Sequence, residues 1–119
     1  MIFDSNILIY LSKHVIKPEI VTNSSAISVI TKIEVLGYPF QNKEEHDILS
    51  EICSVLNVIP LSDEIAEKTI QIRKNYKIKL ADAIIYSTAL VERKPLLTNN
   101  IQDFKLLNEG VELINPFSI

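Results

Sequence analysis

The sequence is poor in the residues that make covalent links and thiolate metal sites. Its 119 residues include a single cysteine, Cys53, so no disulfide can form within the chain. Cys53 lies in the apolar segment Ile52–Leu56, where a lone thiol typically packs as a small hydrophobic side chain. This cysteine usage suits a reducing compartment, and we expect a cytoplasmic protein.

Long apolar runs are also absent. No segment approaches the roughly 20 consecutive apolar residues that a membrane span needs. The first residues, Met1–Asp4, do not show a basic stretch followed by an apolar one, as a secretory leader would. Only two residues are glycine and 47% are hydrophobic, a composition that supports a folded core. We therefore expect one globular domain over residues 1–119, without membrane contact.

Histidine and net positive charge are scarce as well. His14 and His46 lie far apart in the sequence without a partnering motif, so we interpret both as surface or packing residues and do not expect zinc. The formal net charge is -3, the wrong sign for a protein that holds nucleic acid by overall electrostatic attraction. A nucleic-acid substrate would thus need a bound metal or a local basic patch.

One such basic patch lies in residues 73–79, which include four cations. The cations can complement the dipole at the end of a helix, where positive side chains are favourable. They can equally contact RNA. The side chains concerned are Arg73, Lys74, Lys77 and Lys79.

Short apolar segments alternate with helical patterns along the chain. Strands are expected at residues 1–3, 24–28, 58–61, 96–98 and 111–114. Helices are expected at residues 7–11, 29–37, 43–56, 62–76 and 80–93, with a loop and helical turn over 99–107. This alternation predicts an α/β fold with three α/β/α layers around a parallel sheet of four to five strands.

Asp82 is the only charged residue between Ala81 and Val91, at the start of a helix that is apolar almost all round. Such a helix is usually buried. Asp82 shares a face with Ile85 and Ala89, so its carboxylate is expected to point toward packed structure. The alternative is an N-cap or first-turn acid that backbone N–H groups satisfy.

Three further acids follow predicted strands or lie on apolar faces. Glu34 falls on the same side of its helix as Ile30 and Ile33, which form an apolar stripe. It can also be a surface residue at the border of this stripe. Asp4 directly follows the first strand, where it can cap the next helix. Asp103 follows the fourth strand, where it can be a turn residue.

The topology brings these acids together. In doubly wound sheets, ligands bind at the carboxyl ends of the strands, and helices returning to the sheet begin at that same edge. Two carboxylates about 4 Å apart repel by roughly 1 kcal/mol in water and more in a protein interior, so an acidic cluster needs a cation. Carboxylates without histidine or cysteine suit Mg²⁺ or Mn²⁺. The expected ligands are Asp4, Glu34, Asp82 and Asp103.

Four segments resemble the four motifs of the PIN domain, and they are similar above all to those of VapC-type toxins. The segments are Phe3–Leu11, Ile27–Glu34, Leu80–Ile85 and Leu97–Phe104. The resemblance implies a Mg²⁺- or Mn²⁺-dependent endoribonuclease, the toxin of a toxin–antitoxin module, that forms a homodimer and binds a cognate antitoxin.

By the same resemblance, Asp4, Glu34, Asp82 and Asp103 form the acidic cluster. Polar residues support it: Ser5, Asn6, Thr98, Asn99 and Asn100. The chain departs from the family where Asn99 and Asn100 stand in place of an acid that many relatives carry. The fourth ligand is therefore either an oxygen of this pair or Asp103.

The chemistry that we expect is metal-assisted hydrolysis of an RNA phosphodiester, with Asp4, Asp82 and either Glu34 or Asp103 as ligands. One alternative is a non-catalytic PIN-fold RNA-binding or scaffold module, although all four acidic positions are filled. Another is a DNA-directed nuclease of the same architecture. A receiver-type phosphoacceptor fits least, because it needs paired acids after the first strand and Asp4-Ser5 supplies one.

Overall fold

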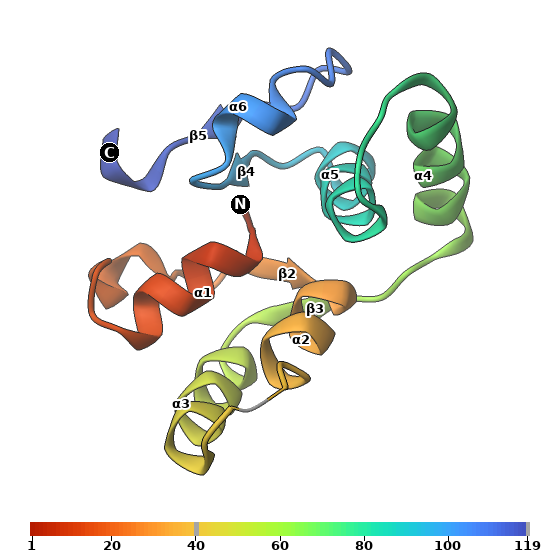
Figure 1. Cartoon of the computed structure of the whole chain (residues 1–119). Helices are drawn as coiled ribbons and strands as arrows, with labels where there is room; N and C mark the ends of the chain where they lie inside the picture. Colours follow the sequence, from red (N-terminus) through yellow and green to blue (C-terminus); the bar gives the residue numbers. More distant parts are fainter. Residues whose placement is uncertain (40, 119) are drawn as a thin grey trace.

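A five-stranded parallel sheet forms the centre of the computed structural model, which describes residues 1–39 and 41–118 (Figure 1). The strands lie in the order β3-β2-β1-β4-β5, and each neighbouring pair is parallel. Their bounds are Ile2–Phe3 (β1), Ala26–Ser28 (β2), Asn57–Ile59 (β3), Leu96–Leu97 (β4) and Leu113–Ile114 (β5). All five predicted strands are present, each shorter than expected.

Helices connect the strands. Their bounds are Ser5–Ser12 (α1), Val29–Leu36 (α2), Lys43–Ser54 (α3), Asp63–Asn75 (α4), Leu80–Glu92 (α5) and Ile101–Phe104 (α6). Two short 3₁₀ segments, Pro18–Ile20 (η1) and Pro116–Ser118 (η2), were not predicted. The 3₁₀ segments lack the apolar periodicity that identifies longer helices, so pattern alone does not reveal them.

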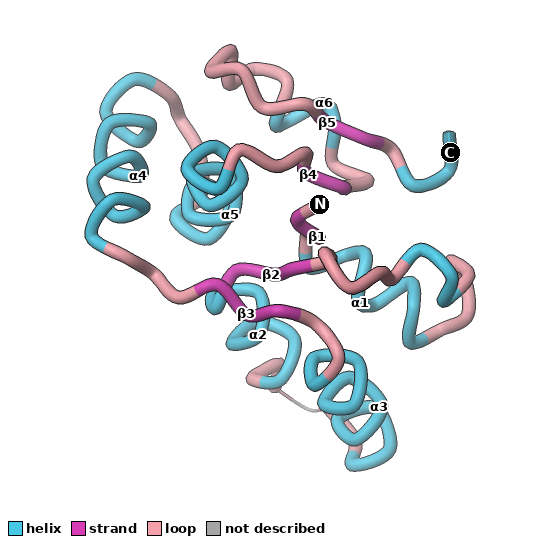
Figure 2. Tube along the Cα trace, turned by 180° about the vertical axis from the view of Figure 1, so that it is seen from behind, coloured by secondary structure: helices cyan, strands magenta, loops and turns pink. Residues whose placement is uncertain are grey.

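One face of the sheet packs against α1 and α3. Successive strand residues point to opposite faces. Phe3, Ile27 and Leu97 are fully buried on this face, in one core with Leu8 of α1 and Leu49 of α3. Figure 2 shows the strands between α1 and α3 on one side and α5 on the other.

The opposite face packs against α4, α5 and α6. Ile2, Ala26 and Leu96 belong to a second core, with Ile72 of α4 and Ile85 of α5. Two apolar cores on the two faces of one parallel sheet make the three-layer α/β/α architecture that the alternating pattern predicted.

Helix ends follow the expected capping chemistry. The Ser62 side chain accepts a hydrogen bond from the Ile65 backbone N–H (3.2 Å) and caps α4. Asp63 lies in the first turn of α4, whereas Arg73 and Lys74 lie in its last turn, as the helix dipole favours. The dipole interpretation of the basic patch therefore holds for Arg73 and Lys74. Lys77 and Lys79 lie beyond the end of the helix.

The spacing of Ile48, Leu49, Ile52, Val55 and Leu56 predicts one apolar face for residues 43–56, but the structure buries only part of that face. Leu49 and Leu56 are buried, whereas Val55 is 65% exposed and Ile48 is also exposed. Cys53 occupies the buried face instead, four residues after Leu49 and therefore above it on the helix. Burial raises the pKa of its thiol, so Cys53 behaves as the hydrophobic packing residue that was expected.

Helix length bears on membrane contact. In the described part of the chain, no helix is both long and apolar enough to cross a bilayer.

We predict that replacing Tyr86 with Phe destabilises the fold. The buried Tyr86 hydroxyl donates to the Leu107 carbonyl (2.7 Å) and accepts from the Glu109 N–H (3.3 Å), which ties α5 to the loop after α6. Leaving these backbone groups unpaired should lower the free energy of unfolding by about 1–3 kcal/mol, measured by urea denaturation. The exposed Tyr38 is the matched control, and Tyr38→Phe should have no effect. Equal stability of the two variants would contradict the prediction.

Candidate active site

The candidate site lies where two neighbouring strands end. After β1 the chain continues to β2 on one side, and it later places β4 on the other side of β1. Such a reversal of strand order opens a crevice at the carboxyl ends, where doubly wound sheets bind ligands. The Asp4 N–H donates to the Leu97 carbonyl (2.9 Å), so the residues that follow β1 and β4 lie side by side.

Asp4 is a buried carboxylate with three hydrogen-bond donors. It is only 5% exposed. Its Oδ1 accepts from the Ser5 N–H (2.8 Å), and its Oδ2 accepts from the Thr98 hydroxyl (2.7 Å) and the Asn6 amide (3.2 Å). Burial raises the pKa of Asp4, and the three hydrogen bonds oppose this shift. Asp4 is therefore both the N-cap of α1 and a wall of the crevice.

Glu34 reaches the same region from α2 as an exposed side chain. Its Oε1 accepts a hydrogen bond from the Ser5 hydroxyl (2.7 Å). The predicted apolar stripe is wrong, because Ile33 is 59% exposed and Thr31 and Val35 form the buried face of α2. Helix periodicity over eight residues leaves the buried face poorly defined, and packing against the sheet selected the other side.

Asp82 lies half-buried in the first turn of α5. Lys79 occupies the N-cap, so Asp82 is not the N-cap of this helix but an acid in its first turn, the other position that the alternative allowed. Burial raises the pKa of Asp82, and the negative charges of Asp4 and Glu34 raise it further, while Lys79 opposes them. Asp82 therefore lies near both other carboxylates.

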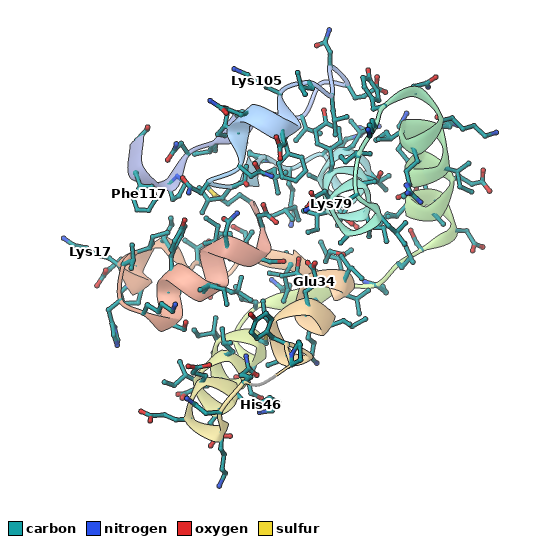
Figure 3. The ribbon with its side chains drawn as sticks, viewed as in Figure 1. Lys17, Glu34, His46, Lys79, Lys105 and Phe117 are labelled. Carbon is teal, nitrogen blue, oxygen red and sulfur yellow. The ribbon has the colours of Figure 1, made fainter. Side chains whose placement is uncertain are left out.

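These three acids line one cavity of about 350 Å³. They come from three separate elements: the end of β1, α2 and α5. Lys79 also lines the cavity, and Figure 3 shows it near Glu34. The remaining lining residues are Ser5, Asn6, Ala81 and Asn100.

Asp103 does not share this cavity. It is exposed on α6 and lines a neighbouring cavity of about 780 Å³ together with Asp82. Its charge is the last and smallest cause of the raised pKa of Asp82. Asn100 immediately precedes α6 and faces the first cavity, whereas Asp103 lies about one helical turn farther along. The structure therefore brings together three of the four predicted acids, with Asn100 beside them.

The predicted polar residues connect the strand ends. The Thr98 hydroxyl donates to Asp4 and accepts from the Asn100 N–H (2.9 Å). The Asn6 side-chain oxygen accepts from the Asn99 N–H (3.2 Å), while its amide donates to Asp4. These contacts hold the loop after β4 against the start of α1.

Tyr10 and Phe117 extend this network and were not found from the sequence. The Asn99 amide donates to the Tyr10 hydroxyl (2.8 Å). The rings of Tyr10 and Phe117 pack edge to face, with their centroids 5.5 Å apart. Tyr10 lies four residues after Asn6, on the same face of α1, which was an available signal. No sequence pattern indicates Phe117.

The cavity fits a hard divalent cation in donor type but not in present spacing. Carboxylate oxygens of Asp4, Glu34 and Asp82 are the ligands that Mg²⁺ and Mn²⁺ prefer. Among residues 1–39 and 41–118, however, no three Asp, Glu, His or Cys side chains lie close enough together to hold one ion. Asp4 and Glu34 are each engaged in hydrogen bonds, and like charges favour separation.

We predict that Asp82→Asn raises or preserves the melting temperature of metal-free protein near neutral pH. A carboxyl whose pKa is higher in the folded protein than in the unfolded chain destabilises the fold where it is ionised in both states. This penalty disappears as pH falls below the unfolded value, about 3.8. The advantage of the Asn variant should therefore shrink when melting is measured at decreasing pH. A lower melting temperature for the variant near pH 7 would contradict this account.

Comparisons with known proteins agree with the fold and identify the family. The sequence profile of the PIN domain matches residues 1–109. A chain in a structure described as a toxin-antitoxin complex from Klebsiella pneumoniae is 34% identical, with 99% of this chain and 98% of that chain covered and a TM-score of 0.78. No curated protein sequence matches the chain.

Two further solved structures have similar folds. A chain of VapBC2 from Rickettsia felis, bound to a DNA fragment from its promoter, is 26% identical, covers 97% of this chain and 98% of its own, and has a TM-score of 0.80. A chain of DNA-bound VapBC from Salmonella typhimurium is 21% identical, covers 97% and 96%, and has a TM-score of 0.81, which shows a shared fold. The profile match over most of the chain, together with the 34% identical relative, shows that this protein belongs to the PIN domain family.

Proposed function

We propose that this protein is a metal-dependent endoribonuclease and the toxin of a toxin–antitoxin pair. The observation that carries the proposal is the cavity at the carboxyl ends of the strands, where Asp4, Glu34 and Asp82 meet. Burial and the negative charges of Asp4 and Glu34 raise the pKa of Asp82, so a cation would be favourable there, and hard cations held by carboxylates serve phosphodiester hydrolysis.

The biological setting is supported by the solved relatives. The 34% identical chain belongs to a toxin–antitoxin complex, and the chain from Rickettsia felis belongs to a VapBC complex. The similarity extends over almost the whole of this chain in both cases. We therefore propose that a cognate antitoxin binds this protein. That this protein forms a homodimer remains a prediction from its resemblance to VapC-type toxins.

Asp4, Glu34 and Asp82 are the residues that would hold Mg²⁺ or Mn²⁺. When bound, the cation would polarise the scissile phosphate and stabilise the charge that develops on it. Glu34 is preferred to Asp103 as the third carboxylate, because Glu34 lines the same cavity as Asp4 and Asp82. Asp103 would then act on the site through its charge alone.

The other residues of the cavity position the substrate and the acids. Three hydrogen bonds fix the Asp4 carboxylate, so it presents the same oxygens without reorganisation. Glu34 is exposed and accepts one hydrogen bond from Ser5 at Oε1, which leaves its other carboxylate oxygen free for the cation. Lys79 on the rim supplies a positive charge to the phosphate.

The first test of the proposed function changes Asp82. Asp82→Asn should reduce cleavage of total RNA by more than about 100-fold, because even the outer-shell partners of a metal account for 10- to 100-fold. The rise in melting temperature on adding Mn²⁺ should also shrink. Asp63→Asn is the matched control, since it changes a first-turn acid of α4 outside the cavity. Undiminished cleavage by the Asp82 variant would remove Asp82 from the site.

The second prediction separates Glu34 from Asp103. Both side chains are exposed, so Glu34→Gln and Asp103→Asn should fold equally well. Glu34→Gln should weaken the Mn²⁺ thermal shift and cleavage strongly, whereas Asp103→Asn should change them less than about tenfold. The reverse order would assign the third carboxylate to Asp103.

The proposed activity itself is tested by incubating the purified protein with total RNA and with DNA, each with Mg²⁺, Mn²⁺ or EDTA. Cleavage of RNA only when metal is present supports the proposal. Cleavage of DNA alone would indicate a DNA-directed nuclease. No cleavage under any condition would leave a non-catalytic RNA-binding or scaffold module.

A further inference from the structure

We propose that Tyr10 and Phe117 are positioning residues for the candidate active site, which they support through the loop after β4. The inference rests on the proposed function, because it concerns how the acidic cavity is kept ready for a cation. Neither side chain lines that cavity, so any effect on it passes through other residues. Tyr10 lies on α1, and Phe117 lies on the 3₁₀ segment η2.

A chain of hydrogen bonds leads from Tyr10 to the buried acid. The Tyr10 hydroxyl accepts from the Asn99 side-chain amide (2.8 Å). The Asn99 backbone N–H donates to the Asn6 side-chain oxygen (3.2 Å), and the Asn6 amide donates to Asp4 Oδ2 (3.2 Å). Tyr10 therefore acts on Asp4 through Asn99 and Asn6.

The orientation of the Asn6 side chain depends on this chain of bonds. An asparagine presents an acceptor oxygen on one side and a donor NH₂ group on the other. Because the Asn99 N–H engages its oxygen, Asn6 turns its NH₂ group toward the Asp4 carboxylate. If the loop moved away, the Asn6 oxygen would be free to face the carboxylate, where two acceptors repel each other. The position of Asn99 thus decides whether Asp4 keeps one of its donors.

Tyr10 offers Asn99 a rigid partner. Asn99 is exposed, so packing does not fix its side chain. The Tyr10 ring is half-buried and packs against the core that α1 shares with the sheet. The same loop carries Thr98, which donates to Asp4, and Asn100, which lines the acidic cavity. Because these three loop residues are consecutive, fixing Asn99 restrains both of its neighbours.

Phe117 in turn restrains the Tyr10 ring. The two rings pack edge to face, with their centroids 5.5 Å apart and their planes at 62°. Figure 3 shows Phe117 beside α1. Phe117 is 55% exposed, so its contribution to the core is small. Its contact with Tyr10 therefore bears on the loop after β4 more than on the stability of the fold.

The backbone after β5 places Phe117 against α1. The Thr98 N–H donates to the Ile114 carbonyl (3.0 Å) next to the pairing of β4 with β5. The chain then turns, because the Asn115 side chain accepts from the Phe117 N–H (2.9 Å). The PIN domain profile matches residues 1–109, so this turn lies beyond the matched stretch. Support for the site accordingly comes from a segment outside the matched family pattern.

The alternative is that the two aromatic residues only stabilise the fold. A purely structural role would change the free energy of unfolding and leave the metal affinity of the folded protein unchanged. A positioning role changes that affinity and the order of the loop after β4 while the protein stays folded. The experiments therefore measure loop order and Mn²⁺ affinity well below the melting temperature, alongside unfolding in urea.

The first experiment uses Tyr10→Phe, which keeps the ring but removes the acceptor for Asn99. In metal-free protein, exchange of the Asn99 backbone N–H with solvent, followed by NMR, should become about three- to tenfold faster. The affinity for Mn²⁺, measured from the electron paramagnetic resonance signal of the free ion, should fall by about three- to tenfold. Tyr38→Phe is the matched control, at a 67% exposed tyrosine outside the acidic cavity, and should change neither. Unchanged exchange or unchanged Mn²⁺ affinity in the Tyr10 variant would overturn the inference.

A double-mutant cycle tests whether Tyr10 acts through Asn99. Asn99→Ala removes the donor side chain but keeps the backbone N–H that bonds Asn6. If both substitutions break the same bond, the double variant should bind Mn²⁺ no more weakly than the weaker of the two single variants. Losses that multiply in the double variant would show separate effects and contradict the proposed route.

The third experiment changes Phe117. Phe117→Ala should weaken Mn²⁺ binding by about two- to tenfold, because the aromatic pair with Tyr10 is lost. Phe117→Tyr keeps a ring against Tyr10 and should bind Mn²⁺ as the wild type does. Val55→Ala, at a 65% exposed apolar residue outside the cavity, is the control. Equal losses in the two Phe117 variants, or no loss in either, would exclude a positioning role for Phe117.

Cleavage assays distinguish this inference from the proposed function. Tyr10→Phe should cleave RNA more slowly at low Mn²⁺ and approach the wild-type kcat at saturating Mn²⁺, because a positioning residue changes how fully the site is occupied. If the wild type cleaves RNA and Tyr10→Phe matches it at every Mn²⁺ concentration, the positioning role fails and the nuclease stands. If the wild type neither binds Mn²⁺ nor cleaves RNA, the proposed function fails. The Asn99 exchange rate in metal-free protein then still decides whether Tyr10 orders the loop.

Discussion

The buried carboxylate of Asp4 is the constraint on which the site depends. A carboxylate at 5% exposure is unfavourable unless donors surround it. Its donors come from Ser5, from Asn6 and from Thr98, which is 94 residues away in the sequence. Because Thr98 also accepts from the Asn100 N–H, satisfying one buried charge joins β1, α1, β4 and the loop before α6.

The three acids of the cavity differ in how they are satisfied. Asp4 is buried and bonded, Glu34 is exposed with one hydrogen bond, and Asp82 is half-buried with its pKa raised by burial and by the other two. This inequality leaves unfavourable charge at Asp82, which a bound cation would relieve. The present spacing of the acids is wider than one ion needs, so ion binding and side-chain rearrangement are expected to occur together.

A local cluster of cations offsets the net charge of -3 for the RNA substrate that we propose. Arg73 ends α4, where it complements the helix dipole, and Lys77 and Lys79 follow it into the cavity beside the acids. Salt limits the range of interactions between exposed charges to about 10 Å at 0.1 M, so cations next to the site matter more than the overall charge. Residues 73–79 therefore complement the dipole of α4 and also place cations beside the candidate active site.

Much of the fold follows from local patterns. Apolar periodicity predicted the strands and helices, and the isolation of Asp82 in an apolar segment indicated a candidate site residue. Only the tertiary structure decided that Glu34 is exposed, that Asn100 rather than Asp103 faces the acidic cavity, and that Tyr10 bonds Asn99 across 89 residues. The physical reason is that local propensity depends on neighbours in sequence, whereas cavities and buried hydrogen bonds depend on how distant segments pack.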